Sequence, residues 1–207
     1  MHARSTTVQG DPQAMDAVIA YVRDEVVPLV GDMDGYVGIS MICDRDSGRC
    51  IVTSTWATEE ARRASASAVA AGRSRVAELL RADTPVVHDW EVAAMHRVRE
   101  TPDGGRVRLI WGHGERGRLE QVLEAWRTTI PPQLEQMPGF CAVSTLIDRA
   151  TGRAVSAVAY ENREAMERSS EQALVVRDRF ASSQDFEITD VAEYDVVLAH
   201  LRIPETV

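Results

Sequence analysis

The sequence predicts an α+β fold built from two ferredoxin-like βαββαβ modules in tandem. The first observation is that CDRDSGR at residues 43–49 returns as IDRATGR at residues 147–153, at an offset of 104 residues. The same offset aligns the chain on both sides without a gap, with about 20 identities over about 92 positions, as diverged repeats show. The second observation is that the hydrophobic period changes in the same order in both copies.

Each copy is expected to open with a strand and a helix. In the second copy, RVRLIWGH at residues 106–113 is typical of a strand. Apolar residues with helical spacing follow at Leu119, Val122, Leu123, Trp126 and Ile130, and in the first copy at Met15, Val18, Ile19, Val22 and Val26. Asp11 is expected to cap the first of these helices, with Pro12 at the first helical position. We expect both helices to break near Pro28 and Pro131-Pro132, because proline cannot donate the interior hydrogen bond.

Two short strands joined by a tight hairpin come next in each copy. The repeated heptapeptide lies between them. Its Gly supplies the positive φ of a tight reversal, and its Asp can accept hydrogen bonds from its own downstream amides. The expected strands are residues 36–43 and 50–56 in the first copy, and 140–147 and 154–160 in the second.

A second helix and a last strand complete each copy. Thr58 and Asn162 are helix caps followed by acidic residues in the first turn. The helices are expected at residues 58–80 and 162–182, and the strands at 86–96 and 189–200. The first module therefore spans residues 1–100 and the second 106–207, with a linker turn at 101–105.

The composition excludes several classes of chemistry and partner. The chain of 207 residues has a formal net charge of -9 and no basic run, so neither nucleic acid nor an anionic membrane surface is expected as a partner. All 23 basic residues are arginine. Schiff-base chemistry, pyridoxal phosphate attachment and a P-loop all require lysine and are therefore not expected.

The cysteines and the N-terminus indicate a cytoplasmic protein. Cys43, Cys50 and Cys141 lack CxxC spacing, so neither a disulfide framework nor a zinc site is predicted, and we expect no metal. Cys43 and Cys50 flank the first hairpin and are expected to be buried small side chains. The stretch MHARSTTVQGDPQ has no apolar segment, and no apolar run reaches the roughly 18 residues of a membrane span.

Three features shared by both copies resemble one known family. They are a glycine followed by an aromatic residue at the second strand (Gly35-Tyr36 and Gly139-Phe140), the D-R-x-[ST]-G-R hairpin, and an aromatic residue before an acidic helix start (TWATEEA and AYENREA). Together they cover nearly the whole chain. In these features the chain resembles the dimeric α+β barrel proteins that include the antibiotic biosynthesis monooxygenases.

The resemblance implies an architecture and an activity. The antiparallel sheets of the two modules would pack as a dimeric α+β barrel within one chain, and whole chains could associate further as a homodimer. The implied function is that of a monooxygenase-like protein that acts on, or binds, a small aromatic or polyketide-like molecule without metal, flavin or any other cofactor. Haem degradation is not expected, because Ser65 and Ser169 replace the Trp of that branch and Arg75 and Arg179 replace its His.

The candidate site gathers aromatic residues and histidines from the second module. Trp111 and His113 are two apart on one predicted strand and therefore share a face. We expect Tyr160, Trp126 and His200 to come near them and to form a pocket for a small aromatic ligand. In this hypothesis His113 or His200 is the catalytic base, and Trp111, Trp126 and Tyr160 bind the substrate.

Two alternatives stand beside this hypothesis. The large side chains could simply fill the space between helix and sheet, in a ligand-binding or structural protein of the same fold without catalysis. The motif GHGERG at residues 112–117 matches the G-x-G-x-x-G pattern of dinucleotide sites. However, the next strand enters a hairpin rather than a parallel βαβ unit, which favours a strand-to-helix turn.

Overall fold

The computed structural model describes residues 1–82 and 84–201, and it divides into two compact units. Unit 1 comprises Met1–Trp90 and the stretch that begins at Asp195, and unit 2 comprises Glu91–Tyr194. The end of the predicted second module, residues 202–207, lies outside the described residues. The units differ from the sequence repeats because the last strand of each repeat contributes to both units. These two strands are β4 (Val86–Arg97) and β8 (Glu187–Leu201).

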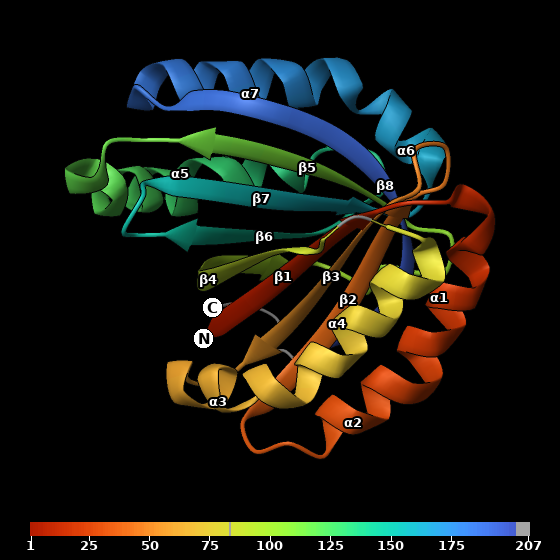
Figure 1. The fold of residues 1–207 in the computed structure, drawn as a ribbon. Coiled ribbons are helices and arrows are strands. Elements are labelled where there is room, and N and C mark those ends of the chain that lie inside the picture. Colours follow the sequence, from red (N-terminus) through yellow and green to blue (C-terminus); the bar gives the residue numbers. More distant parts are fainter. Residues whose placement is uncertain (83, 202–207) are drawn as a thin grey trace. The chain divides into compact units, whose positions relative to one another are not determined.

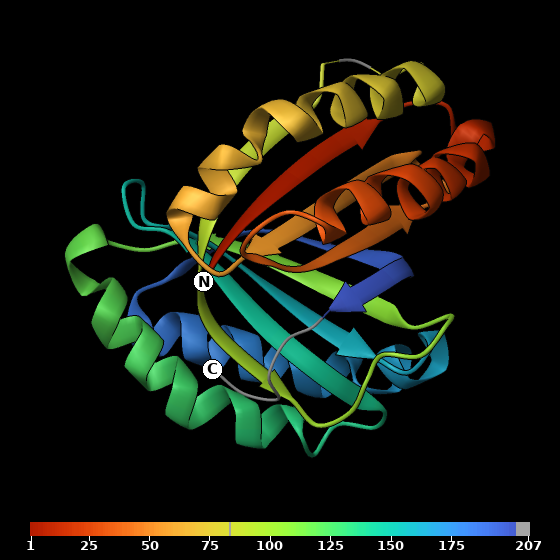
Figure 2. The ribbon, with the colours of Figure 1, turned by 90° about the horizontal axis from the view of Figure 1, so that it is seen from below.

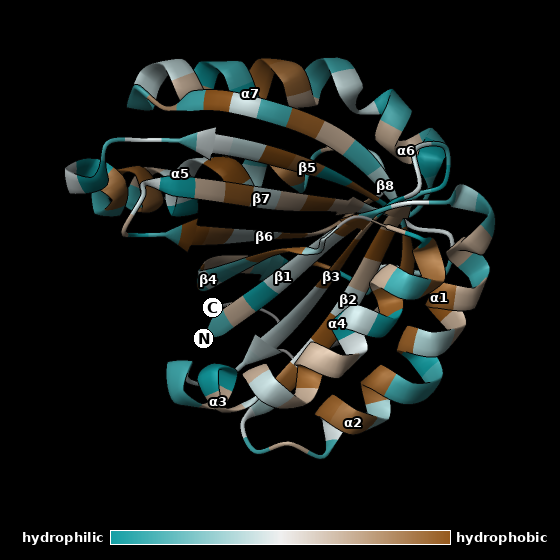
Figure 3. Ribbon diagram, viewed as in Figure 1, coloured by the Kyte–Doolittle hydropathy of each residue, from teal (hydrophilic) through white to brown (hydrophobic). Residues whose placement is uncertain are grey.

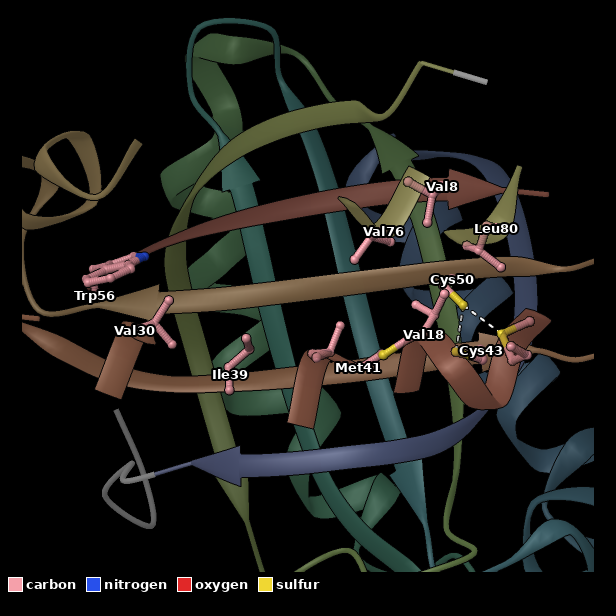
Figure 4. Packing of buried hydrophobic residues seen from close by; sticks show 12 residues of the cluster. Val8, Val18, Val30, Ile39, Met41, Cys43, Cys50, Trp56, Val76 and Leu80 are labelled. Atoms are coloured by element: carbon pink, nitrogen blue, oxygen red, sulfur yellow. Dashed lines mark hydrogen bonds between the residues drawn. The ribbon is translucent and has the colours of Figure 1, made fainter. Parts of the chain in front are cut away.

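The sheet of unit 1 is antiparallel, with the strand order β1-β3-β2-β8. Its strands are β1 (His2–Gln9), β2 (Tyr36–Asp44), β3 (Arg49–Trp56) and β8 from Asp195 onward. In the β2-β3 hairpin Cys43 lies directly opposite Cys50, and their Sγ atoms are 2.8 Å apart. Both thiols are fully buried, and the hydrogen bond with Cys50 together with burial raises the pKa of Cys43. They belong to the core cluster shown in Figure 4, as expected for small buried side chains.

Helices cover one face of this sheet. A 3₁₀ turn (Pro12–Ala14), capped by Asp11, leads into α1 (Met15–Tyr21), a π-helical turn (Val22–Val26) and α2 (Val27–Gly31). The predicted break near Pro28 takes the form of the π-helical turn, whose wider spacing accommodates a residue that cannot donate to the preceding turn. The core between these elements includes Trp56, Val18, Ile39, Met41 and Leu80 (Figure 4).

Unit 2 repeats the arrangement, with the strand order β5-β7-β6-β4. Its strands are β5 (Arg106–His113), β6 (Phe140–Asp148), β7 (Arg153–Tyr160) and residues 91–97 of β4. Helices α5 (Leu119–Leu134) and α7 (Ser170–Gln184) pack side by side and lie along one face of this sheet (Figure 2). Hydrophobic residues recur along β6 and β7 (Figure 3). Two ferredoxin-like modules in tandem and the predicted α+β class are therefore confirmed.

The predicted break at Pro131-Pro132 is wrong. Helix α5 continues through both prolines and ends at Leu134. Each proline removes one interior hydrogen bond. The last turn nevertheless stays helical, and its residues Ile130, Pro131 and Leu134 are buried. Packing of this turn therefore outweighs the lost backbone bonds.

The second helix of each copy, predicted as continuous, is divided at a serine. In unit 1 the helices are α3 (Glu59–Ala64) and α4 (Ala66–Leu80), and in unit 2 they are α6 (Arg163–Arg168) and α7. The hydroxyl of Ser65 donates to the Arg62 carbonyl at 2.8 Å, and that of Ser169 donates to the Ala165 carbonyl at 2.8 Å. Such back-bonding of a buried hydroxyl competes with the helical ladder and bends the chain.

The repeated heptapeptide is a pair of equivalent hairpin turns. Asp148 accepts hydrogen bonds from the Ala150 amide at 2.9 Å and the Thr151 hydroxyl at 2.6 Å. Gly152 has a φ of +81°, and its carbonyl accepts from the Gly114 amide at 3.0 Å. A Cβ on Gly152 would lie 2.3 Å from the Gly114 carbonyl oxygen. The hairpin therefore packs against the turn between β5 and α5 through a backbone hydrogen bond, and this close contact requires glycine at residue 152.

The same packing explains the GHGERG motif. A Cβ on Gly112 would lie 2.1 Å from the ring of Phe186, so this glycine makes room for an aromatic side chain. Gly114 contacts the hairpin and the Phe186 ring. The first two glycines of the motif thus serve contacts within the protein.

In the part of the chain that the structure describes, each helix is too short or too polar to traverse a lipid bilayer.

Candidate functional site

Unit 2 contains a cavity of about 90 Å³ between its sheet and helices α5 and α7. Strand alternation places Arg108 and Ile110 of β5 on the face that the helices cover. Helix α5 supplies a stripe at intervals of four residues, and Phe180 of α7 and Tyr160 of β7 complete an aromatic wall. The stripe consists of Trp126, Ile130 and Leu134.

Arg108 is the charged group buried in this wall. Only 7% of the residue is exposed, so its guanidinium needs protein partners. Nε and Nη2 donate to the Glu193 carboxylate at 3.0 and 2.7 Å, and Nη2 also donates to the Ser170 hydroxyl at 2.9 Å. The guanidinium carbon lies 5.9 Å from the centre of the Tyr160 ring. The arrangement fixes one cation at the edge of an apolar, aromatic space.

Three hydroxyl groups add hydrogen-bonding capacity to the cavity. The hydroxyl oxygens of Thr145 on β6 and Ser156 on β7 are 2.8 Å apart. Burial raises the pKa of Tyr160, with the nearby Arg108 opposing this shift, so the phenol stays protonated at neutral pH. Its hydroxyl points at the Met137 sulfur, 3.7 Å away. Tyr160 can therefore act as a ring surface and a weak donor, but not as a base.

The structure brings together two of the five residues predicted from the sequence. Trp126 and Tyr160 both line the cavity. Trp111 alternates with Ile110, which lines the cavity, so strand geometry turns Trp111 and His113 toward the opposite face of the sheet. His113 Nε2 lies 3.0 Å from the Thr151 carbonyl oxygen of the hairpin. The predicted binding and catalytic roles of these residues stay predictions.

His200 and its counterpart His96 lie outside the cavity of unit 2. His200 belongs to unit 1, where its Nδ1 is 3.1 Å from the Tyr36 hydroxyl and its ring stacks on Tyr36 at 6.3 Å. Its counterpart His96 belongs to unit 2, where its ring stacks on Phe140 and its Nε2 is 2.7 Å from a Glu135 carboxylate oxygen. Both histidines thus contact the aromatic residue that opens a second strand. Neither lines the cavity of unit 2.

Sequence reasoning missed Arg108. The available signal was an arginine within the apolar run RVRLI, repeated as Arg4 in the first copy. Long charged side chains are rarely buried unless they are paired. An arginine retained at the same strand position in both copies therefore indicates a buried ion pair.

Unit 1 has an equivalent cavity of about 50 Å³. Except for Val8, every residue that lines it has its counterpart 104 positions later in the wall of the larger cavity. Val22 stands where unit 2 has Trp126, and Ser54 where it has Val158. The repeat has therefore preserved the position of the cavity and changed its lining.

The buried arginine of unit 1 has a different set of partners. Arg4 Nε donates to Asp89 at 2.9 Å, and Arg4 Nη1 donates to the Arg62 carbonyl at 3.2 Å. Arg62 also forms an ion pair with Asp89. Burial opposes ionisation of Asp89, but the hydrogen bonds from Arg4 and Arg62 together hold its pKa below the ordinary value.

Among the described residues, no three His, Cys, Asp or Glu side chains are grouped to hold a metal ion.

Curated relatives match the whole chain. Uncharacterized protein Rv2557 of Mycobacterium tuberculosis is 42% identical over 207 residues, which are 100% of this chain and 92% of the relative. Uncharacterized protein Rv2558 of the same organism is 42% identical over 208 residues, covering 100% of this chain and 88% of the relative. No family model matches the chain.

Solved structures share the fold at low sequence identity. A protein from Fusobacterium nucleatum, provisionally named a monooxygenase, matches with a TM-score of 0.71 and 11% identity over 97% of this chain and 94% of that one. An anthrone oxidase-like protein matches with a TM-score of 0.64 and 16% identity over 99% and 94%. A ferredoxin-fold protein related to antibiotic biosynthesis monooxygenases, from Listeria monocytogenes, has a TM-score of 0.54 and 5% identity over 94% of both chains. The predicted resemblance is confirmed at the level of fold.

Proposed function

Because the chain belongs to one family with the mycobacterial proteins Rv2557 and Rv2558 and has a monooxygenase-like fold, we propose that it binds a small aromatic molecule in the unit 2 cavity and oxidises it with molecular oxygen. In this proposal neither metal nor flavin takes part. The observation that carries it is that Trp126, Tyr160 and Phe180 line one cavity together with the buried guanidinium of Arg108.

The cavity suits an electron-rich phenol. Aromatic walls favour a flat ring through offset or edge contacts. A guanidinium in a site shielded from water favours the phenolate over the phenol, because a nearby positive charge lowers the pKa of an acid. The phenolate is the electron-rich form that can reduce oxygen. Arg108 would thus activate the substrate electrostatically, as preorganised charges do in enzymes.

The reaction balances without a further reductant. A phenol with a free para position loses its O–H and para C–H hydrogens, and one oxygen atom of O₂ becomes the new quinone carbonyl. The second oxygen atom leaves as water with the two hydrogens. The ring gives up four electrons and O₂ accepts four. Because His113 and His200 do not line this cavity, the phenolic proton passes to solvent water. The Arg108 guanidinium accepts no proton and stabilises the phenolate that is left.

The cavity volume limits the substrate class. About 90 Å³ is less than the roughly 150 Å³ of an engineered cavity that binds benzene. Full burial of even one ring therefore requires a wall side chain to move, and half-buried Phe180 on α7 is placed to do so. We expect single-ring phenols to be preferred over naphthols and tricyclic anthrones.

Oxygen uptake by the full chain tests the proposal. The panel contains methoxyphenols, naphthols and anthrones, with chelator present, and quinone absorbance is recorded in parallel. We expect uptake with at least one single-ring phenol. Ala173→Leu, which fills the cavity, should reduce kcat/KM at least about tenfold, since a small misplacement of a substrate can cost about 100-fold. The matched control Val69→Leu, at the counterpart position in unit 1, should leave the rate unchanged. Uptake by the folded chain no higher than in buffer for every substrate would refute the oxygenase.

A ligand-binding protein without catalysis is the second candidate. It is favoured by the lining of the cavity, which includes neither a histidine nor a carboxylate. In that case phenols should quench tryptophan fluorescence saturably, through Trp126, without oxygen uptake. Ala173→Leu should abolish this quenching, whereas Val69→Leu should not.

A further inference from the structure

The cavity of unit 1 has more positive than negative charge around it. Three arginines, Arg4, Arg62 and Arg73, lie at or beside its wall. The Asp89 carboxylate accepts from both Arg4 and Arg62. Glu59 lies 3.6 Å from Arg62 but pairs more closely with Arg63, at 2.6 Å. The carboxylates of Asp89 and Glu59 therefore pair with other arginines and not with Arg73.

Arg73 has a buried nitrogen without a partner. Its Nη1 is shielded from solvent and makes no hydrogen bond to the described residues. Burial lowers the pKa of Arg73, and the positive charge of Arg4 adds to this shift against a weaker attraction by Asp89. A guanidinium has five donors, and leaving one buried and unpaired costs free energy. An anion in the cavity would remove this cost.

In the second copy, the arginine at the position of Arg73 has an acidic partner. Arg177, the counterpart of Arg73, also lines its cavity but bonds Asp178 at 2.7 Å. In the first copy Ser74 stands at the position of this acid. Arg62 in turn stands where the second copy has Met166. Two substitutions thus remove one negative charge and add one positive charge near the smaller cavity.

The rest of the wall defines the ligand. Apart from Arg4, Arg73 and the hydroxyls of Thr6 and Ser54, the lining is aliphatic or glycine, with no aromatic residue. A volume of about 50 Å³ admits only a few atoms. We propose that the unit 1 cavity binds a short-chain aliphatic carboxylate, whose two oxygens accept hydrogen bonds from Arg73 and whose chain lies among the valines of α4 and the π-helical turn. This site is separate from the cavity assigned to the aromatic substrate.

Calorimetric titration of the full chain with acetate, propionate, butyrate and valerate tests this site. Affinity should rise about fourfold per added methylene and then fall when the chain outgrows the cavity. Arg73→Met should weaken binding of the best carboxylate at least about tenfold, because an ion pair with two hydrogen bonds is lost. Arg177→Met is the matched control and should leave the affinity unchanged.

Ser74→Asp provides an independent test that leaves the arginine in place. Ser74 is exposed on α4, so the variant should fold. The new carboxylate should pair with Arg73 Nε as Asp178 pairs with Arg177 Nε, and so neutralise the guanidinium that would hold the ligand. We expect loss of carboxylate binding in this variant. The site is refuted if no carboxylate binds the folded chain, if folded Ser74→Asp binds as tightly as the parent, or if phosphate and chloride bind as well as butyrate. Since the unit 2 cavity takes no part, these outcomes are independent of phenol oxidation.

Discussion

The two cavities occupy equivalent places in their units and differ in the side chains that line them. In unit 2, Trp126 fills space, and each of the two arginines that line the wall pairs with one carboxylate, Arg108 with Glu193 and Arg177 with Asp178. In unit 1, the counterpart of Trp126 is Val22, and Asp89 is shared between two arginines. The same backbone frame thus holds a largely aromatic and aliphatic lining in unit 2 and an aliphatic lining without aromatic residues in unit 1. The two copies therefore differ in the side chains at equivalent wall positions and not in where the cavity lies.

The largest effect is expected from giving unit 2 the small residue of unit 1. Trp126→Val removes a buried indole from a packed wall and should lower the free energy of unfolding by about 3 kcal/mol. Denaturant unfolding followed by circular dichroism measures the change. The reciprocal variant Val22→Trp overfills a fully buried position and should cost about 1 to 3 kcal/mol. A neutral effect of Trp126→Val would mean that the indole does not support the wall.

Removal of the buried arginine should distinguish the two charge networks. Arg108→Leu leaves Glu193 without its cation, and because that carboxylate can still reach water we expect a loss of about 2 to 3 kcal/mol. Arg4→Leu should cost less, because Arg62 still pairs with Asp89. The midpoints of denaturant unfolding of the two variants give the two losses in stability. Equal losses would contradict a shared role for Arg62.

The hairpins should respond alike, in contrast to the cavities. Gly48 and Gly152 both have positive φ, and a Cβ on either would lie within 2.1 and 2.3 Å of a glycine carbonyl oxygen. Gly48→Ala and Gly152→Ala should each cost about 2 kcal/mol through backbone strain and displacement of that contact. Thermal unfolding of the two variants provides the measurement. Unequal losses would show that the hairpins no longer serve the same purpose.

The smallest effect concerns acid stability. The folded-state pKa of Asp89 lies below its unfolded value, so its ionised form stabilises the protein above the unfolded value, and this contribution is lost as the pH falls through the folded value. Asp89→Asn should therefore destabilise the protein at pH 6 and converge with the parent once the pH falls below the folded-state pKa of Asp89. Because the carboxylate is partly exposed, we expect less than about 1 kcal/mol. A difference in stability that stays constant as the pH is lowered would point to packing instead of charge.

Much of the fold could be predicted because local chemistry specifies it. Asp148, Gly152 and their counterparts make turns that depend on nearby residues alone, and the apolar stripe of α5 follows from its period. The helix breaks at Ser65 and Ser169 could not be predicted in the same way. A serine bends a helix only when its hydroxyl turns back to a carbonyl, and this depends on burial.

The cavity was harder to predict than the elements around it. Period-two alternation showed that Trp111 and His113 share a face, but not which face the helices cover. The covered face was the one of Arg108 and Ile110. In the sequence, Trp111 and His113 are residue types typical of ligand sites, whereas an arginine in an apolar run is a weaker signal. The buried charge was the better indicator, because its burial requires partners placed by the tertiary structure.

The division of β4 and β8 between the units has an evolutionary consequence. Each unit completes its sheet with a strand segment encoded in the other repeat. Two identical chains exchanging these segments would form the same pair of sheets, but one gene would then encode both sites and every substitution would occur twice. Two copies in one chain can differ from each other at any position. Residue 74 can therefore be serine where residue 178 is aspartate, and residue 22 can be valine where residue 126 is tryptophan, because each site has its own codons in one gene.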